Sequence, residues 1–175
     1  KPVGCASGLI EPNISADVIL SSSILPDEGS KSIGKGLFLV KPGSYLIDGI
    51  SFEGTESPHD RLGGRRFGMS TLWKWEQGGL IFAHLGGAAA PLTIENRLLI
   101  GKPDVLFIAV GGGAKIYNGQ EAARIVEMLQ PKIVIPVQYQ LRDNVKRQSC
   151  DQDGIGSFLE AMEDYDVKKV GLKYN

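Results

Sequence analysis

The chain has 175 residues, 42% of them hydrophobic, and a formal net charge of −1 at pH 7. This length and apolar content suit one domain with a buried core, so we predict a single domain over residues 1–175. The balanced charge gives no electrostatic basis for binding nucleic acid or a membrane surface, and no apolar run approaches the ~20 residues that a membrane span requires.

The first half of the chain predicts β-strands. Short segments rich in β-branched, aromatic and leucine residues occupy positions 16–22, 36–40, 44–54 and 70–76. A Gln-Gly-Gly turn then leads into an apolar strand at 80–83, which predicts a hairpin. The loop at 57–68 is long, charged and rich in glycine, and loops of that length are functional or mobile.

The second half alternates strands and helices. We predict a strand covered on both faces at 104–110, a glycine-rich turn, a helix and then a strand at 132–137. A second amphipathic helix at 154–165 and a last strand at 167–173 follow.

The first of these helices has a defined start and end. Asn118 and Glu121 have the spacing of a capping box, and Pro131 ends the helix. One face of the helix is apolar, through Ala122, Ile125, Val126 and Leu129.

An antiparallel half followed by a strand–helix–strand half predicts a layered α/β sandwich. In such sheets, functional sites lie beyond the ends of the strands. Here those ends carry His59, His84, Gly86 and Gly87, the glycines at 111–113, and Gln138.

Five segments in this order resemble the metallo-β-lactamase superfamily: ADVIL (16–20), SPHD (57–60), GLIFAHLGG (79–87), DVLFIAVGGG (104–113), and the stretch that ends in PVQY (136–139). The similarity is greatest to the branch of L-ascorbate-6-phosphate lactonase and related metal-dependent hydrolases. It covers about residues 9–139, while residues 140–175, with the C-terminal helix and strand, lie outside it. The resemblance implies an αββα sandwich, here without part of the usual N-terminal strand pair, so an exposed sheet edge would need a partner or a cover.

The same resemblance implies where metal ligands would stand. Ser23, Leu25 and Glu28 occupy the places of three histidines, and only Asp27 keeps the family's residue there. His59 matches a later ligand histidine, whereas Gly87 replaces the aspartate that would bridge two metals and Gln138 replaces the last ligand histidine. His84 keeps a position that supports its loop in the family.

A zinc centre needs three or four converging nitrogen, sulfur or carboxylate ligands, and two metals also need a bridging carboxylate. We therefore expect no dinuclear zinc centre and no cofactor. The alternative is one divalent ion (Zn, Mn or Mg) held by Asp27, Glu28, His59 and Gln138.

Each candidate residue also has a structural interpretation. Asp27 and Glu28 suit the start of a helix, His59 could bond to a backbone carbonyl, and His84 could be structural. The arginines Arg61, Arg65 and Arg66 could recognise a phosphate or carboxylate, meet a protein partner, or be solvated. Trp73 and Trp75 share one face of a strand, which is typical of a core.

Our main hypothesis is a degenerate, non-catalytic protein of this fold. It would act as a scaffold or subunit, or bind a small anionic ligand in a vestigial cleft at Asp27, His59, Gly87 and Gln138. The candidate ligand-binding residues are Arg61, Arg65, Arg66 and His84. The alternative is a metal-dependent hydrolase of an ester, lactone or phosphoester with an altered mononuclear site. A third hypothesis is that the arginine loop binds a protein partner.

We expect a protein partner or a homo-oligomer, and no nucleic acid. The N-terminus lacks the apolar region of a signal peptide, and Cys5 and Cys150 have no metal-type spacing. We expect free thiols in a soluble, intracellular protein, in the cytoplasm or in an organelle after removal of a transit peptide, with a disulfide as the alternative.

Overall fold

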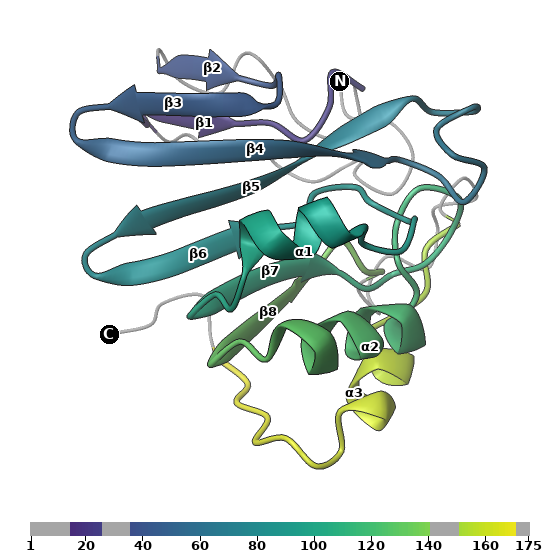
Figure 1. Cartoon of the computed structure of the whole chain (residues 1–175). Helices are drawn as coiled ribbons and strands as arrows, with labels where there is room; N and C mark the ends of the chain where they lie inside the picture. Colours follow the sequence, from purple (N-terminus) through teal and green to yellow (C-terminus); the bar gives the residue numbers. More distant parts are fainter. Residues whose placement is uncertain (1–14, 26–35, 141–150, 171–175) are drawn as a thin grey trace.

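The computed structural model describes residues 15–25, 36–140 and 151–170 (Figure 1). Within them, a two-stranded parallel sheet lies beside a six-stranded sheet with the order β3-β4-β5-β6-β7-β8. The strands are β1 (Val18–Leu20), β2 (Leu37–Leu39), β3 (Gly43–Ile47), β4 (Ile50–Pro58), β5 (Met69–Gln77), β6 (Leu80–His84), β7 (Val105–Ala109) and β8 (Ile133–Val137). The helices are α1 (Ile94–Ile100), α2 (Gly119–Leu129) and α3 (Gly156–Ala161). No helix in these ranges is long and apolar enough to cross a membrane.

The predicted change from antiparallel to parallel pairing is confirmed. Strands β3 to β6 pair antiparallel, and β6, β7 and β8 pair parallel, with the crossover through α2 between the last two. The mixed α/β sandwich is therefore the architecture that the sequence predicts.

Two of the three antiparallel connections are hairpins that turn through two residues with positive φ. Gly78 and Gly79, at φ 61° and 75°, join β5 to β6 as predicted. The prediction of one strand over 44–54 is wrong, because Asp48 and Gly49, at φ 50° and 80°, turn the chain between β3 and β4. An Asp-Gly pair favours a two-residue turn with left-handed backbone at both positions, and this signal outweighs the strand-forming residues around it.

The capping box predicted for α2 is confirmed. The Glu121 amide donates to the Asn118 side-chain oxygen, and the Asn118 amide donates to the Glu121 carboxylate, both at 2.9 Å. The helix ends at its C-cap Gln130, which has a left-handed backbone with φ of 48° and is followed by Pro131.

Two predictions at other helices and strands need correction. The sequence analysis did not predict α1, which begins at the N-cap Thr93. The strand predicted at 167–173 is absent over 167–170, where Val167 and Val170 are exposed and no neighbouring strand offers pairing; 171–173 lie outside the described residues. Helix α3 is also shorter than the predicted 154–165.

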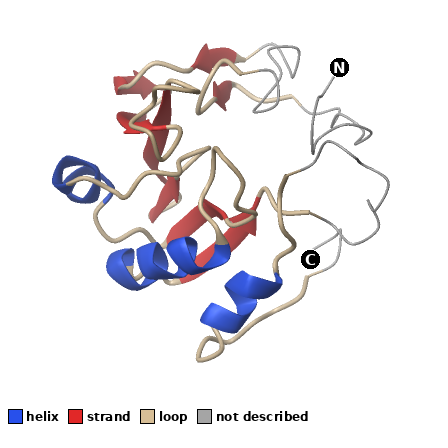
Figure 2. Cartoon of the chain, turned by 90° about the vertical axis from the view of Figure 1, so that its right-hand side faces the viewer, coloured by secondary structure: helices blue, strands red, loops and turns tan. Residues whose placement is uncertain are grey.

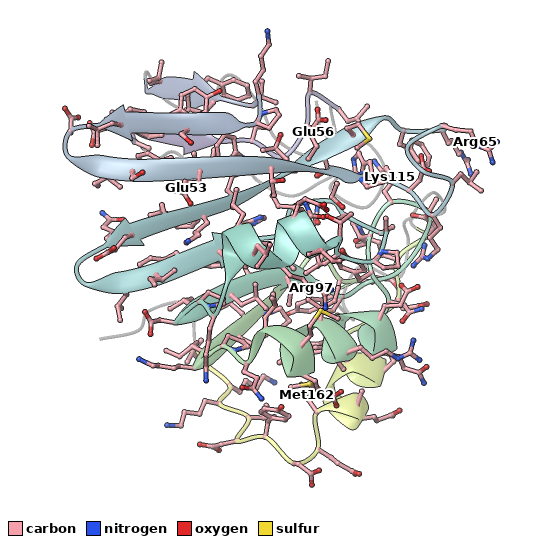
Figure 3. All side chains as sticks on the ribbon, in the orientation of Figure 1. Glu53, Glu56, Arg65, Arg97, Lys115 and Met162 are labelled. Carbon is pink, nitrogen blue, oxygen red and sulfur yellow. The ribbon has the colours of Figure 1, made fainter. Side chains whose placement is uncertain are left out.

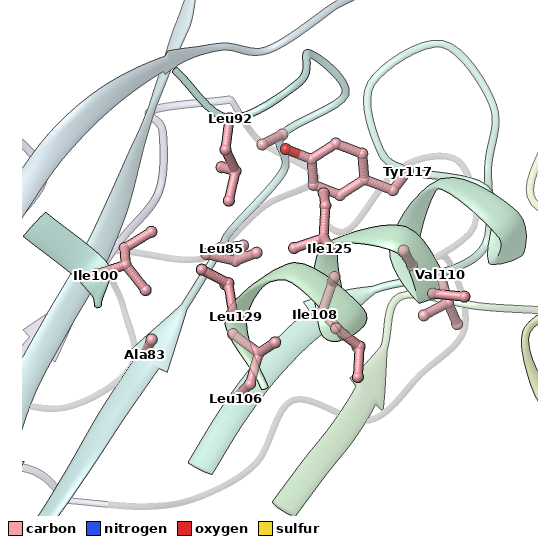
Figure 4. Close-up of a cluster of buried hydrophobic side chains, with 14 of the residues drawn as sticks. Ala83, Leu85, Leu92, Ile100, Leu106, Ile108, Val110, Tyr117, Ile125 and Leu129 are labelled. Atoms are coloured by element: carbon pink, nitrogen blue, oxygen red, sulfur yellow. The ribbon is translucent and has the colours of Figure 1, made fainter. Parts of the chain in front are cut away.

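The six-stranded sheet separates two apolar clusters, because alternate residues of a strand point to opposite faces. Figure 2 shows two of the helices, α2 and α3, side by side. On one face, Leu72 of β5 and Leu106 of β7 join side chains from all three helices, including Ile100, Leu129 and Phe158. Figure 4 shows Leu106 with Ile100 and Leu129 in this cluster. On the other face, Trp73 packs with Phe52 and with Leu39 of β2. Trp73 is a core residue as predicted, while Trp75 is half-buried and stacks on Phe82 with the ring centroids 5.2 Å apart.

Candidate functional site

Strands β4, β6, β7 and β8 run in the same direction, so their carboxyl ends reach the same edge of the sheet. We call the residues that follow these ends the strand-end site: His59, Gly86, Gly87, the glycines at 111–113, and Gln138. Contacts across the loops join these segments, and ligand sites of open α/β sheets lie at such an edge.

His59 is fully buried immediately after β4. Its backbone amide donates to the Gly68 carbonyl, and its Nδ1 lies 3.2 Å from the Lys115 carbonyl oxygen. A carbonyl only accepts, so this contact assigns the proton to Nδ1 and makes Nε2 an acceptor. The arrangement is the backbone contact that the structural interpretation expects, and it is also how metal-ligating histidines are oriented.

The loop after His59 is organised by Asp60, which is buried. Its two carboxylate oxygens accept four backbone N–H groups, from Leu62, Gly64, Arg66 and Phe67, at 2.8–3.0 Å. Burial on its own would raise the pKa of Asp60, but these donors together hold it below its ordinary value. The carboxylate is therefore committed to the loop backbone.

Arg61 ties this loop to the start of α2. Its guanidinium donates to both carboxylate oxygens of Glu121, and also to the carbonyls of Gly113 and Ile116. Burial would raise the pKa of Glu121, yet the Arg61 hydrogen bond and the Asn118 amide lower it overall. The Arg61 guanidinium, which the sequence suggested as a ligand-binding group, thus donates its hydrogen bonds to protein acceptors.

Arg65 and Arg66 lie on the exposed side of the loop, and Lys115 approaches from the turn after β7 (Figure 3). The Arg66 guanidinium carbon is 4.7 Å from the centre of the Phe67 ring, and the Lys115 ammonium is 5.6 Å from it. The Phe67 ring in turn lies 6.3 Å from the ring of His59. Three cationic side chains therefore lie on the outer rim of the strand-end site, and the sequence analysis missed Lys115 and Phe67.

The glycines after β6 allow a close approach of the chain. The Gly86 amide donates to Nδ1 of His84 at 2.9 Å, and the His84 ring stacks on Phe107. A Cβ on Gly86, whose φ is 53°, would lie 2.3 Å from the Ser22 Cβ. His84 thus supports this loop, and Gly87 is buried and brings no side chain to the site.

Gln138 follows β8 in a left-handed backbone conformation, with φ of 51°. Its side-chain Oε1 is buried and has no hydrogen-bond partner within the described part of the chain. Gly111 is required beside it, because a Cβ there would lie 2.3 Å from the Gln138 carbonyl oxygen.

The segment after residue 150 returns to this edge, which the sequence analysis did not predict. The Asp153 amide donates to the Gly111 carbonyl at 2.6 Å, and the Gln140 amide donates to the Asp153 carbonyl at 2.9 Å. The Asp151 carboxylate lies against Gly113, 2.9 Å from the position of a Cβ on that residue. A resemblance that ends near 139 gave no signal for this return.

Two hydroxyls are buried inside the sheet near the same edge. Ser57 and Ser70 face each other across β4 and β5, and are 0% and 1% exposed. Neither hydroxyl has a hydrogen-bond partner among the residues that the structure describes.

The described side chains do not fit a dinuclear zinc centre. No group of three or more His, Cys, Asp or Glu side chains within residues 15–25, 36–140 and 151–170 could hold a metal ion. Of the described positions at which the resemblance expects a metal ligand, only position 59 carries a usual one, a histidine. Position 138 has the amide of Gln138, and position 87 has a glycine without a side chain. Asp27 and Glu28, like Cys5 and Cys150, lie outside the described residues.

Comparisons with known proteins agree with this architecture. The family model of the beta-lactamase superfamily domain matches residues 1–138. A candidate Zn-dependent hydrolase of the metallo-β-lactamase superfamily from Thermotoga maritima has a solved structure 27% identical to this chain, with a TM-score of 0.67 over 85% of this chain and 70% of that one. No curated protein matches.

Two further solved structures are similar in fold alone. A candidate metal-dependent hydrolase from Veillonella parvula is 11% identical, with a TM-score of 0.58 over 84% of this chain and 70% of that one. The metallo-β-lactamase fold protein YhfI from Bacillus subtilis is 10% identical, with a TM-score of 0.54 over 79% of this chain and 76% of that one.

Proposed function

This chain belongs to the beta-lactamase superfamily domain family, and from that premise we propose that it is a non-catalytic member which binds a small anionic ligand at the strand-end site. The observation that carries the proposal is the donor set. Gly87 and Gln138 stand where the resemblance places a bridging carboxylate and an imidazole. Without those ligands the described part of the site lacks the groups that would activate a metal-bound water.

The charges at the rim support an anion as the ligand. Arg66 and Lys115 lie against Phe67, whose ring is near that of His59, and Arg65 is exposed on the same loop. The hydrogen-bonding capacity of the nearby Asp60 carboxylate is taken up by four backbone amides. Guanidinium groups bind phosphate and carboxylate in two-point contacts. Arg61 is not assigned to the ligand, because Glu121 and two carbonyls already take up its donors.

Titration calorimetry with inorganic phosphate tests this proposal. We expect saturable binding to the wild type, with an affinity reduced about tenfold or more in the Arg65→Ala/Arg66→Ala variant, which loses two cations from the rim. Lys41→Ala removes an exposed cation outside the arginine loop and should bind like the wild type. Equal binding by all three proteins, or no binding to any, would reject the site.

The same double variant addresses the third hypothesis, a protein partner for the arginine loop. Replacing Arg61 as well would confuse the result, because its loss detaches the loop from α2. If a complex is lost with Arg65→Ala/Arg66→Ala while phosphate binding persists, the loop binds a protein and the anion site lies elsewhere.

A mononuclear hydrolase is the second candidate, and the orientation of His59 favours it. A histidine whose Nδ1 bonds to a carbonyl presents Nε2 as a ligand, and the buried Oε1 of Gln138 is an oxygen donor at the neighbouring strand end. Asp27, Glu28, His59 and Gln138 would hold the ion, which would lower the pKa of a bound water.

Elemental analysis separates the two candidates. The purified protein is measured after dialysis with zinc, manganese or magnesium, beside His59→Gln and the ligand-restoring variant Gln138→His. Metal near background in the wild type, with a gain in Gln138→His, supports the non-catalytic function. Stoichiometric metal in the wild type that is lost in a folded His59→Gln variant would replace it with the hydrolase.

A further inference from the structure

A shallow apolar groove lies on the helical side of the molecule, away from the strand-end site. It has a volume of about 440 Å³ and is formed between α1 and the last turn of α2. Its walls include Ile94 and Leu98 of α1 and Met128 of α2, which are 62%, 77% and 49% exposed. A contiguous group of large exposed apolar side chains is typical of an interaction surface.

The exposure follows from the way α1 is anchored. Asn96 and Ile100 face the core, and the Asn96 amide donates to the Thr55 hydroxyl and the Glu56 carbonyl of β4. Ile94 and Leu98, four residues apart, therefore share the outward face. Because the polar Asn96 lies on the inner face of the helix and bonds to β4, the apolar Ile94 and Leu98 lie on the outer face, exposed to solvent.

Two cations border this groove. Arg97 and Lys102 line it, and neither side chain forms a hydrogen bond or salt bridge within the described part of the chain. The groove thus offers an apolar floor with uncompensated positive charge at its rim, which fits an acidic segment that also carries apolar side chains.

The end of α3 has those complementary properties. Glu160, Glu163 and Asp164 are exposed, and Tyr165 and Val167 beside them are 48% and 57% exposed. We call residues 160–167 the acidic ridge. Phe158 and Met162 fix it to the same apolar cluster that holds Ile100 of α1 and Leu129 of α2.

Groove and ridge therefore belong to helices that pack on the same apolar cluster. We propose that a second copy of this chain docks there, with the acidic ridge of each copy in the groove of the other. A two-fold interface uses the same surface of both copies, so a groove and a ridge that complement each other can form each contact twice. The inference does not depend on anion binding at the strand-end site.

A charge-swap experiment with full-length protein tests the pairing. One variant, Arg97→Glu/Lys102→Glu, makes the groove acidic, and the other, Glu160→Lys/Glu163→Lys, makes the ridge basic. Each homodimer then places like charges against each other, and we expect its dissociation constant to rise about 100-fold or more. Mixed together, the two variants place opposite charges at both contacts, so the heterodimer should form.

Mass by light scattering over a concentration series gives the readout, and circular dichroism checks that the variants are folded. Lys41→Glu is the matched control and should dimerise like the wild type. Salt should weaken the wild-type dimer, because the Debye length, the distance over which charges interact, falls to ~3 Å at 1 M ionic strength. A monomeric wild type, dimers that survive either charge reversal, or variants that fail to associate on mixing would each overturn the proposal; the first would leave an acidic segment of another protein as the occupant.

Discussion

The conformation of the loop beside the strand-end site depends on one residue, Asp60, through its carboxylate. Four amides of residues 62–67 converge on it, and they lower its pKa against the effect of burial. The folded pKa lies below the unfolded value, so the carboxylate stabilises the fold above the unfolded pKa. That contribution is lost as the pH falls through the folded value, below about pH 4.

We therefore expect Asp60→Asn to lower stability at neutral pH and to flatten the acid side of the stability curve. Urea unfolding from pH 3 to pH 7 measures both effects, and hydrogen exchange should show faster exchange of the amides of Leu62, Gly64, Arg66 and Phe67. Asp17→Asn, at an exposed side chain, is the control. A pH profile for Asp60→Asn parallel to that of the wild type would contradict this role.

Tyr117 offers a second test at the level of one atom. Its buried hydroxyl donates to the Ala90 carbonyl at 2.6 Å, and burial raises the pKa of the phenol. Tyr117→Phe leaves that carbonyl unsatisfied, at a cost of about 1–3 kcal/mol of unfolding free energy. Tyr45→Phe removes an exposed bond of similar length, to the Lys41 carbonyl, and should cost less. Equal losses in the two variants would show that burial does not decide the effect.

Sequence reasoning named the strand ends that meet at one edge of the sheet, but not the contacts between them. The strand ends at His59, Gly87 and Gln138 follow from alternating strands and loops, because chain direction alone brings them to one edge. The pairing of Arg61 with Glu121 joins residues 60 positions apart, and Lys115 reaches Phe67 through another loop. Neither local pattern nor composition carries such information.

The helices show where capping signals suffice. Helix α2 combines a capping box with an inward apolar face, so both patterns predict the same element. Helix α1 also has a capping box, but Asn96 takes the place of the usual Glu or Gln, and two of its apolar residues, Ile94 and Leu98, point outward. A pattern that assumes apolar residues inside therefore misses it.

We expect Asn96→Ala to destabilise the protein more than Thr93→Ala does. Thr93 supplies one side-chain cap, worth about 1 kcal/mol. Asn96 accepts a hydrogen bond from the Thr93 amide and donates to two acceptors on β4, so its loss breaks three part-buried hydrogen bonds, at about 1 kcal/mol for each. Thermal and urea unfolding of both variants decide the order, and the reverse order would mean that α1 is held mainly by its cap.

For the stability of the whole molecule, the main feature is the division of the core into two apolar clusters. The cluster beneath the helices joins strands β5 to β7 with α1, α2 and α3, whereas the cluster around Trp73 is smaller and joins β1 and β2 to the sheet. The sequence predicts an antiparallel half followed by a strand–helix–strand half, but not this division, which depends on which face each side chain takes.

Because the two clusters differ in size, we expect β1 and β2 to unfold locally at a lower free energy than the rest of the protein. Leu106→Ala, in the large cluster, should lower global stability by about 2–5 kcal/mol. Leu39→Ala should mainly accelerate exchange of amides in β1 and β2, while β7 stays protected. Native-state hydrogen exchange resolves the two, and loss of protection in β7 to the same extent in both variants would indicate one cooperative unit.

The left-handed backbone at Gln138 has a consequence for evolution. Among non-glycine residues, Asn, Asp and His are enriched in this conformation, so the chain already offers histidine a suitable backbone there. Glutamine and histidine codons differ only in their third base. A metal ligand at this strand end is therefore a single base change away, and a laboratory selection for hydrolysis would not have to rebuild the turn that positions it.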